Sequence, residues 1–504
     1  MNSQGDAKNQ AVSMGPGLPS GYGTPDVGRL REIVGADNVA ADPADCYVYG
    51  RDASVHRASA QAVVRPMDAA AVQALLRYAS AERIPVIPRG SGSGMSGQAV
   101  PISGGIVLDM KGMNRILEIN LADVYVRVEP GVVDDDLNKA LRPHGVFYPP
   151  TPASSRIATI GGEIANNASG TRSVKYGATR DSVLGMKVVL ASGELVTLGS
   201  RTRVEASGYQ LARLMVGSEG TLGVIVEATM GFVPIPRFRC MGAACFDRLE
   251  EAGETISEII SSGCLPSVLE LVDKVAILAA NASLGLGLPE VEAMLLYEAD
   301  GMVKEAVDYE IARMEEICRR HQGFGIKHSY DEKERMQIFY GRKKLFPALS
   351  KYKDLLACTS LADDMTVPYS KMADLARKIH EIAERNGLVM TAYGHCGSGC
   401  MHTKILMDTS KGEQWAAARR AVEELYEYVR SSGGTTSAEH GIGLSKAPDF
   451  KREKADSLEL MRAVKRAFDP LNILNPMKLQ DAPDDWLTAT DLRYRQRDQA
   501  EPPR

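Results

Sequence analysis

Residues 88–97 read Pro88-Arg89-Gly90-Ser91-Gly92-Ser93-Gly94-Met95-Ser96-Gly97. The strand-like run 84–87 precedes them, and a second apolar run follows at 105–108. Glycine adopts positive φ easily and lets a ligand approach the backbone closely. Successive N–H groups in such a turn form a concave anion site, to which hydroxyl groups add donors. The stretch therefore predicts a diphosphate-binding loop, and an ordinary flexible loop is the alternative.

The spacing of these glycines argues against a nicotinamide site of the Rossmann type. Such sites need G-x-G-x-x-G at the start of a helix, with an acidic residue about 20 positions later. Here Gly90, Gly92 and Gly94 alternate with other residues before Gly97, and the chain then leads into a strand. We therefore reject a nicotinamide cofactor.

Composition places the chain among ordinary globular proteins. It has 504 residues, enough for two or three domains, with 44% hydrophobic residues and a net charge of −5. There is no strong basic excess, so nucleic acid is not an expected partner. No apolar run reaches about 18 residues, so no transmembrane segment is expected. The eight cysteines form no CxxC pair and residues 1–24 lack an apolar signal core, so we expect a cytoplasmic protein.

The order of elements predicts an α+β protein with two main domains. Short helices and strands alternate over 25–235, after a loose tail at 1–24, and the Pro-rich residues 234–236 mark a boundary. A second α+β domain follows at 236–445, then a segment at 446–480 and a polar tail at 481–504. Expected helices are 27–34, 67–82, 134–141, 249–262, 302–321, 415–431 and 458–468. Expected strands are 106–108, 116–119, 125–128, 294–298, 388–393 and 403–407, with a hairpin of 183–190 and 194–198.

Four more clusters rich in glycine follow the first at long spacing. They lie at 149–162, 165–170, 176–177 and 217–225. The first two of these are too dense in Gly, Asn and Pro for the interior of a helix or strand. They are either further cofactor-binding loops or the turns of a glycine-rich β domain.

Two histidines and a glutamate form a candidate metal site. His395 and His402 flank a six-residue turn with two glycines, and Glu439 and His440 follow one helix later. Two imidazoles and one carboxylate suffice for a divalent metal and leave a position open for substrate. The alternative is that these are surface side chains. Cys396 and Cys400 are interpreted as small buried thiols rather than ligands.

Arg342 is a candidate for substrate binding. It follows apolar and aromatic residues and precedes two lysines. A guanidinium group can bind a carboxylate through two parallel hydrogen bonds. The alternative is a basic cluster on the surface.

In their order along the chain, these motifs resemble the FAD-linked D-2-hydroxy-acid dehydrogenases. The motifs that carry the resemblance are 88–97, 159–162, 217–223, 395–402, 439–443 and 472–476. The family includes D-lactate dehydrogenases, D-2-hydroxyglutarate dehydrogenases and the FAD subunit of glycolate oxidase, and it belongs to the vanillyl-alcohol-oxidase type of flavoprotein. The resemblance covers about residues 45 to 480. It implies an FAD-binding domain of two α+β lobes, an α+β cap (substrate) domain, and a return of 446–480 to the FAD domain.

The resemblance also implies roles for individual residues. Those that would hold the FAD diphosphate are Pro88, Arg89, Gly90, Ser91, Gly92, Ser93, Gly94 and Gly97. Those that would line the rest of the cofactor are Pro152, Ala153, Ser154, Gly161, Gly162, Asn166, Asn167, Ala168, Ser169, Gly170, Tyr176, Gly177, Glu219, Gly220, Ile225 and Asn475. His395, His402 and Glu439 resemble the ligands of zinc or manganese. His440 resembles the base, and Arg342 the carboxylate anchor. The glycine loop has no His or Cys, so non-covalent FAD is expected.

Three positions depart from the family pattern. Ser398 stands where the family has Asp, Cys400 where it has Asn, and Met477 where it has Gly. Both histidines of the turn are retained, so the departures concern the residues that orient the ligands and the choice of substrate.

The implied reaction is oxidation of a D-2-hydroxy acid to the 2-oxo acid by hydride transfer to flavin N5. Lactate is the first expectation, then glycolate or 2-hydroxyglutarate. Electrons would pass to a quinone, an electron-transfer flavoprotein or an iron–sulfur partner. Through such a partner the protein would contact a membrane peripherally. A homodimer is one expected assembly. The alternatives are an FAD transferase resembling alkyl-glycerone-phosphate synthase, a non-catalytic FAD subunit of a larger complex, and an oxidase that reduces oxygen directly.

Overall fold

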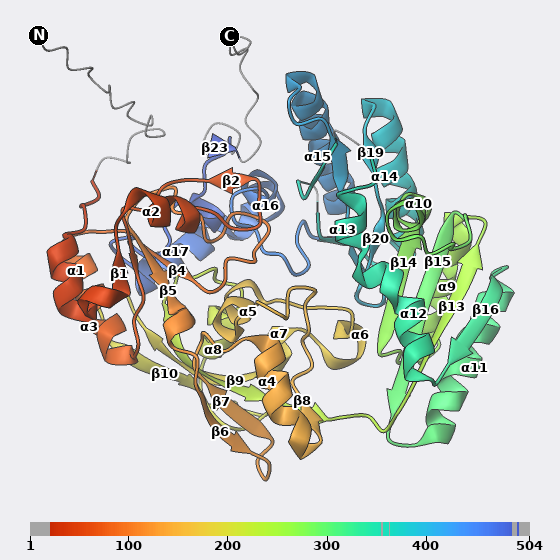
Figure 1. The fold of residues 1–504 in the computed structure, drawn as a ribbon, viewed down its shortest axis with the longest axis horizontal. Coiled ribbons are helices and arrows are strands. Elements are labelled where there is room, and N and C mark those ends of the chain that lie inside the picture. Colours follow the sequence, from red (N-terminus) through yellow and green to blue (C-terminus); the bar gives the residue numbers. More distant parts are fainter. Residues whose placement is uncertain (1–20, 354–355, 362, 486–490, 493–504) are drawn as a thin grey trace, which may run out of the picture.

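The computed structural model describes residues 21–353, 356–361, 363–485 and 491–492. The expected α+β class is confirmed. Figure 1 shows two lobes, coloured red to yellow, beside a third in green to teal, and the blue C-terminal part lies back against the first. Residues 1–20, 486–490 and 493–504 of the two predicted tails lie outside the described residues. Tyr22 lies in the described part of the N-terminal tail predicted at 1–24, and it donates its hydroxyl hydrogen to the carbonyl of Asn472.

The first lobe contains a four-stranded sheet of order β1-β3-β5-β4, in which the last three strands are parallel. The strands are β1 (Val39–Ala40), β3 (Ala62–Val64), β5 (Ile106–Asp109) and β4 (Val86–Arg89). The helices are α1 (Val27–Val34), α2 (Pro43–Tyr49) and α3 (Ala69–Ala81). One face of α3, with Val72, Leu75, Leu76 and Ala79, is buried in the core of this lobe. Residues 88–97, here called the glycine stretch, begin with the last two residues of β4, so the sheet holds this loop at its edge.

The second lobe contains a five-stranded antiparallel sheet of order β10-β9-β11-β7-β6. Its strands are β6 (Ile116–Asn120), β7 (Tyr125–Val128), β9 (Val183–Val189), β10 (Leu195–Gly199) and β11 (Val224–Gly231). Its helices are α4 (Asp134–Leu141), α5 (Ile160–Asn166), α6 (Ser173–Tyr176), α7 (Thr179–Ser182) and α8 (Leu211–Met215). The predicted hairpin is β9–β10, and Gly193 supplies a positive φ at its turn. A short pair, β8 (Val146–Phe147) and β12 (Val233–Pro234), leads out of the lobe.

The third lobe, here called the cap, contains a sheet of order β16-β13-β15-β14-β20. Its strands are β13 (Phe238–Phe246), β14 (Val268–Asp273), β15 (Ala293–Gly301), β16 (Phe324–Ser329) and β20 (Tyr393–Gly394). One face packs on α9 (Leu249–Ser261), α11 (Lys304–Arg320), α14 (Met372–Asn386) and α15 (Gly412–Ser431). The other face packs on α10 (Lys274–Leu284), α12 (Glu332–Lys343) and α13 (Leu345–Leu349).

The single strand expected at 388–393 is wrong, because the segment is divided between two sheets. Its first part, β19 (Val389–Met390), pairs with β22 (Ile405–Met407), which also pairs with β17 (Ala357–Thr359). Its last part is β20, which pairs with β14. At the break, the Ala392 N–H donates to Asp273 instead of to a neighbouring strand. A further pair, β18 (Met365–Thr366) with β21 (Cys400–Met401), lies close to the histidine turn.

The C-terminal segment completes the first lobe. It contains α16 (Ala447–Glu453) and α17 (Leu458–Phe468). The Val86 N–H donates to the Ile473 carbonyl at 2.8 Å, and the Asn475 N–H donates to the Val86 carbonyl at 2.8 Å. Ile473 and Leu474 are fully buried in the core of that lobe. The chain therefore extends the edge of β4, the strand that leads into the glycine stretch.

The expectation that the dense glycine clusters lie outside regular structure is wrong where both clusters contribute residues to α5 (Ile160–Asn166), which include Gly161 and Gly162. Both lie in the first turn of α5, where Thr159 is the N-cap and accepts a hydrogen bond from the Gly162 N–H. Glycine in a helix costs about 1 kcal/mol relative to alanine. A Cβ at Gly161, however, would lie 2.6 Å from the Cβ of Pro130. The close approach of this helix to Pro130 thus requires glycine at that position.

In the part of the chain that is described, no helix combines the length and the apolar character that a bilayer crossing needs.

Candidate functional site

The glycine-rich clusters that are distant in sequence meet in space. A Cβ at Gly90 would lie 2.2 Å from the hydroxyl oxygen of Thr159, at the start of α5. A Cβ at Gly220 would lie 3.2 Å from Pro88. The glycine stretch, the N-terminus of α5 and the 217–223 turn therefore pack against one another. Glycine at Gly90 and Gly220 is what allows this close approach.

The same loops are bonded to the segment that follows Glu439. The buried Glu219 carboxylate accepts from the N–H of Ile442 at 2.6 Å and of Gly443 at 3.0 Å. Asn475 donates its side-chain amide to the carbonyls of Glu219 and Gln98 at 2.7 and 3.0 Å. Burial raises the pKa of Glu219 to about 7, although the two N–H donors act to lower it. The Glu219 side chain thus holds the loop after His440 in place.

Three residues expected to line the cofactor have other contacts as well. The Tyr176 hydroxyl donates to Asp300 of the cap at 2.9 Å. The Ile225 side chain packs in the hydrophobic core of the second lobe. The guanidinium of Arg89 lies inside the glycine stretch, where a Cβ at Gly92 would be 2.0 Å from it.

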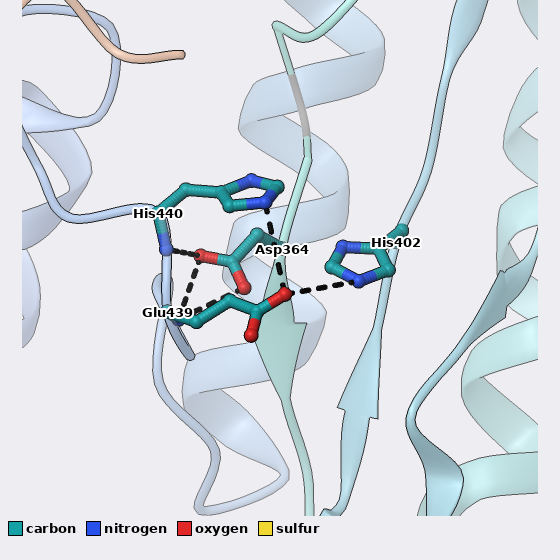
Figure 2. A group of neighbouring side chains, drawn as sticks. All are labelled: Asp364, His402, Glu439 and His440. Carbon is teal, nitrogen blue, oxygen red and sulfur yellow. Dashed lines mark hydrogen bonds and ion pairs between the residues drawn. The ribbon is translucent and has the colours of Figure 1, made fainter. Parts of the chain in front are cut away.

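Three imidazoles converge on one carboxylate oxygen. His395 follows β20, His402 follows β21, and Glu439 and His440 lie in the loop after α15. Oε1 of Glu439 is 3.3 Å from Nε2 of His395, 3.4 Å from Nε2 of His402 and 3.8 Å from Nε2 of His440. Figure 2 shows the last two rings pointing toward this oxygen. The sequence expectation that these four residues come together agrees with this geometry.

Each of the three imidazoles also has a carboxylate at its other nitrogen. Nδ1 of His395 is 2.5 Å from Oε1 of Glu270. Asp363 serves both remaining rings: its Oδ1 is 3.3 Å from Nδ1 of His402, and its Oδ2 is 3.2 Å from Nδ1 of His440. A carboxylate that accepts from Nδ1 keeps the proton there and leaves the Nε2 lone pair directed at the centre. Among these contacts the His395–Glu270 pair is a hydrogen bond, whereas Nδ1 of His402 and of His440 lies at ion-pair distance from Asp363 without one.

The spacing of the donor atoms fits a tetrahedral metal ion. Bonds of about 2.0–2.2 Å from a divalent ion to imidazole and carboxylate place neighbouring ligand atoms about 3.3–3.6 Å apart. The two shorter distances from Glu439, to His395 and to His402, lie in this range, and the 3.8 Å distance to His440 lies outside it. Oε2 of Glu439 is buried and has no hydrogen-bond partner among the described residues. The distances from Glu439 therefore suit a metal held by His395, His402 and Glu439, with His440 beside it. The donor atoms that all lie within 4.8 Å of one another are those of Asp364, His402, Glu439 and His440, a group that does not include His395.

Asp364 lies within 4.8 Å of three of these residues but is committed elsewhere. Its carboxylate accepts from the backbone N–H of Ala438, Glu439 and His440, at 3.1, 3.0 and 2.7 Å. The Lys446 ammonium donates to it at 3.0 Å. We interpret Asp364 as the anchor of the loop that carries the glutamate and the third histidine, as the bonds in Figure 2 indicate.

Arg342 lies beside this centre in the last turn of α12. Its Nε donates to Oε2 of Glu270 at 2.6 Å, and its guanidinium lies 4.9 Å from the centre of the Tyr393 ring. The surface-cluster alternative is excluded, because only 10% of its side chain is exposed. Glu270 joins Arg342 to His395, so the candidate anchor and the candidate metal centre form one network.

The charges of the network follow from opposing effects. Burial acts to lower the pKa of His395, but the Glu270 and Glu439 carboxylates outweigh it and raise this pKa to about 10. Burial likewise acts to lower the pKa of His440, and Asp364 and Asp363 raise it. Without a metal ion, the His395 imidazole therefore holds a proton that a metal ion must displace from its Nε2 atom.

The two thiols and Ser398 make structural contacts. Cys396 donates to the carbonyl of Leu269, and Cys400 faces Asp364 at 3.7 Å. Burial raises the pKa of both thiols well above the ordinary value, so they remain protonated. Ser398 donates to the carbonyl of His395 at 3.0 Å and closes the turn. The interpretation of both cysteines as buried thiols is confirmed.

Sequence reasoning missed the residues that support the centre, chiefly Glu270, Asp363 and Asp364. Glu270 carried a usable signal, because it is a charged residue in the middle of the apolar strand 268–272. The two aspartates form an acidic pair between apolar residues. Such a pair is common on surfaces, and its partners are about 40 to 80 residues away, so nothing local indicates its role.

Comparison with known proteins agrees with this arrangement. Residues 60–199 match the model of an FAD binding domain, and residues 235–479 match that of the C-terminal domain of FAD linked oxidases. The chain is 36% identical over 454 residues to glycolate oxidase subunit GlcD of Bacillus subtilis (strain 168), covering 90% of this chain and 96% of that protein. It is 32% identical over 458 residues to a mitochondrial D-lactate dehydrogenase (cytochrome) of Arabidopsis thaliana, covering 90% and 79%.

Among solved structures, the fold is similar to that of 4-ethylphenol oxidase from Gulosibacter chungangensis, with a TM-score of 0.73 at 19% identity over 92% of this chain and 98% of that one. The two matched domains, the relatives and this shared architecture lead to one assignment. The chain belongs to the FAD-linked D-2-hydroxy-acid dehydrogenases, a family of vanillyl-alcohol-oxidase-type flavoproteins.

Proposed function

We propose that the protein oxidises a D-2-hydroxy acid to the corresponding 2-oxo acid, with non-covalently bound FAD as oxidant and a divalent metal, zinc or manganese, at the histidine centre. Lactate is the favoured substrate, followed by glycolate and 2-hydroxyglutarate. The observation that carries the proposal is the convergence of His395 and His402 on Glu439 at metal-ligand spacing, with Arg342 in the same network.

In this proposal Arg342 binds the substrate carboxylate. Its Nε is already bonded to Glu270, and the two terminal nitrogens of the guanidinium supply the parallel donors that a carboxylate accepts. The bond to Glu270 fixes the plane of the group before the substrate arrives, so less side-chain entropy is lost on binding. The buried position also strengthens the charge–charge attraction relative to water.

His440 accepts the proton of the substrate 2-hydroxyl at Nε2. Its Nδ1 faces Asp363, so the proton of the neutral ring stays on that side. The ring lies next to the donor set without matching its spacing, as a base that acts on a bound hydroxyl would. When bound, a metal held by His395, His402 and Glu439 would supply Lewis acidity toward this hydroxyl, and FAD held at the glycine-rich loops would supply the oxidant.

Reduced FAD must then pass two electrons on. A quinone, an electron-transfer flavoprotein and an iron–sulfur partner remain the proposed acceptors. We propose a cytoplasmic location, with peripheral contact to a membrane through such a partner.

The test is anaerobic mixing of the holoprotein with D- and L-forms of lactate and 2-hydroxyglutarate and with glycolate, following the flavin absorbance. We expect bleaching by at least one D-hydroxy acid, and much slower bleaching by its L-form. A chelator-treated sample should react slowly and recover when zinc or manganese is added.

The alternatives predict different results. Turnover of a phosphate-bearing substrate without lasting bleaching would indicate a transferase without net redox change. A protein that binds FAD but is bleached by none of these acids would contradict the proposal in favour of a non-catalytic subunit. Rapid reoxidation by oxygen alone would indicate an oxidase.

A further inference from the structure

Asp363 faces the Nδ1 atoms of two of the three imidazoles, on the side away from Glu439. Its Oδ1 lies 3.3 Å from Nδ1 of His402, and its Oδ2 lies 3.2 Å from Nδ1 of His440. The two rings are stacked, with centroids 5.1 Å apart and planes at 17°. One carboxylate therefore lies within ion-pair distance of both rings, one oxygen to each. Nδ1 of both rings and Oδ1 of Asp363 have no other hydrogen-bond partner among the described residues, so this carboxylate is the acceptor placed nearest to them.

The position of this carboxylate is itself fixed. The Lys404 ammonium forms an ion pair with Oδ2 of Asp363 and donates to the hydroxyl of Ser360 at 2.8 Å. It lies 5.3 Å from the centre of the Phe346 ring. Lys404 is 2% exposed and Asp363 1%. Removal of one partner of such a buried ion pair leaves an uncompensated charge, so each partner requires the other.

We propose that Asp363 is a positioning residue shared by the metal centre and the base, held by Lys404. It fixes the proton of His402 on Nδ1, so that Nε2 can bind metal, and it fixes the proton of His440 on Nδ1, so that Nε2 can accept a proton. One side chain thus couples metal affinity to base function. This inference rests on the proposed function for the role of His440, whereas its metal half can be tested without substrate.

The variant Asp363→Asn tests whether one side chain must accept from both His402 and His440. An asparagine side chain has one acceptor oxygen and one NH₂ donor. It can accept from one imidazole, but it must present a donor to the other, which then has to move its proton to Nε2 or turn away. We expect apoprotein of this variant to bind Zn²⁺ about 10- to 100-fold more weakly than wild type, the usual effect of losing the partner of a ligating histidine.

A matched control is available in the cap. Asp273 is also a fully buried aspartate facing a histidine, since its Oδ2 lies 2.8 Å from Nε2 of His380, outside the centre. The Asp273→Asn variant should bind Zn²⁺ within about twofold of wild type. The absorption spectrum of bound Co²⁺ should change for Asp363→Asn and stay the same for Asp273→Asn, because it reports the arrangement of the ligands.

A double variant protects the test against loss of folding. In Asp363→Asn/Lys404→Met both charges of the pair are removed together, and thermal stability should return toward that of wild type. Its Zn²⁺ affinity should stay as weak as that of Asp363→Asn. Wild-type affinity in the folded double variant would overturn the proposal, because Asp363 would then be only the counter-ion of Lys404.

The base half is tested by a double-mutant cycle at saturating metal. If Asp363 acts on flavin reduction through His440, then Asp363→Asn/His440→Asn should be no slower than His440→Asn alone. Multiplying losses would overturn this half. A wild-type protein that binds no divalent metal would contradict the proposed function and this inference together. Wild-type metal binding with unchanged affinity in Asp363→Asn would contradict this inference alone.

Discussion

At the scale of single residues, each imidazole at the centre lies between two carboxylates. His395 lies between Glu270 and Glu439, and His402 lies between Asp363 and Glu439. The carboxylate at Nδ1, from Glu270 or Asp363, decides which ring nitrogen carries the proton. The Glu439 carboxylate lies at Nε2, where it and the imidazoles can bind the same metal ion. Burial strengthens both interactions, because few water molecules compete for the donors and acceptors.

Arg342→Lys tests the carboxylate anchor. Lysine keeps the charge next to Glu270 but replaces a planar fork by a single ammonium group. We expect kcat/KM for the hydroxy acid to fall about 10- to 100-fold, in line with the loss of a charge-assisted hydrogen bond, while FAD and metal content stay unchanged. Steady-state kinetics of the purified holoprotein measure this. Arg377→Lys, an exposed arginine in an ion pair on the cap surface, is the control. Equal kcat/KM in the two variants would remove Arg342 from the substrate site.

Asp134 and Glu163 form a buried carboxyl pair in the second lobe, away from the histidine centre. Burial raises the pKa of Asp134 to about 7 and that of Glu163 well above its ordinary value. Between pH 4 and 7 the folded protein therefore holds protons that the unfolded chain releases. Stability from this source is complete below about pH 4 and is lost as the pH rises through about 7. One such proton gives a slope of about 1.4 kcal/mol per pH unit.

The variant Asp134→Asn should flatten this dependence. Its side-chain oxygen can still accept from Asn138, which donates to Asp134 at 2.7 Å. We expect the thermal midpoint of wild type to fall more steeply than that of the variant between pH 5 and 7. Asp136→Asn, on the exposed side of the same helix, should follow wild type. Parallel curves for wild type and Asp134→Asn would show that Asp134 does not hold an extra proton in the folded protein at these pH values.

At the scale of elements, α5 joins the glycine stretch to the second lobe through close backbone contacts. In an open helix, Gly→Ala stabilises by about 0.5–1 kcal/mol. At Gly161 the added Cβ would lie 2.6 Å from Pro130, so we expect a loss of about 1–3 kcal/mol, as for other overpacked sites. Gly162→Ala is the comparison, because its nearest contact is the Thr159 hydroxyl at 3.2 Å. Thermal unfolding of the two apoproteins measures the difference. A Gly161→Ala variant as stable as Gly162→Ala would contradict the packing argument.

The elements that could be predicted are those whose signals are local. The helix at 458–468 and the strand at 125–128 have the expected bounds, because each has a clear apolar pattern and a Pro or Gly soon after its end. The break between β19 and β20 could not be predicted, because it depends on Asp273, more than 100 residues earlier. Helix α5 was missed because its glycines signal a loop locally, whereas their reason is a contact with Pro130 in the folded protein.

At the scale of the whole molecule, the site is assembled from all parts of the chain. The glycine stretch comes from the first lobe, Glu219 from the second, the histidine centre from the cap, and Asn475 from the returning C-terminal segment, as the colours in Figure 1 allow the reader to follow. The motifs and the family resemblance indicated that the glycine stretch, Glu219, the histidines and Asn475 belong to one site. The supporting carboxylates Glu270 and Asp363 were not indicated, because their role exists only once distant segments meet.

The most direct test of the central claim is elemental analysis combined with anaerobic stopped-flow on four variants. We predict that His395→Ala, His402→Ala and Glu439→Ala each lose metal and activity together. His440→Asn should retain metal and FAD but reduce the flavin about 10²- to 10⁴-fold more slowly, the usual contribution of a positioned base. Loss of metal in His440→Asn with retention in Glu439→Ala would reverse the roles assigned to these neighbours. Unchanged metal content in all four variants would contradict the metal centre itself.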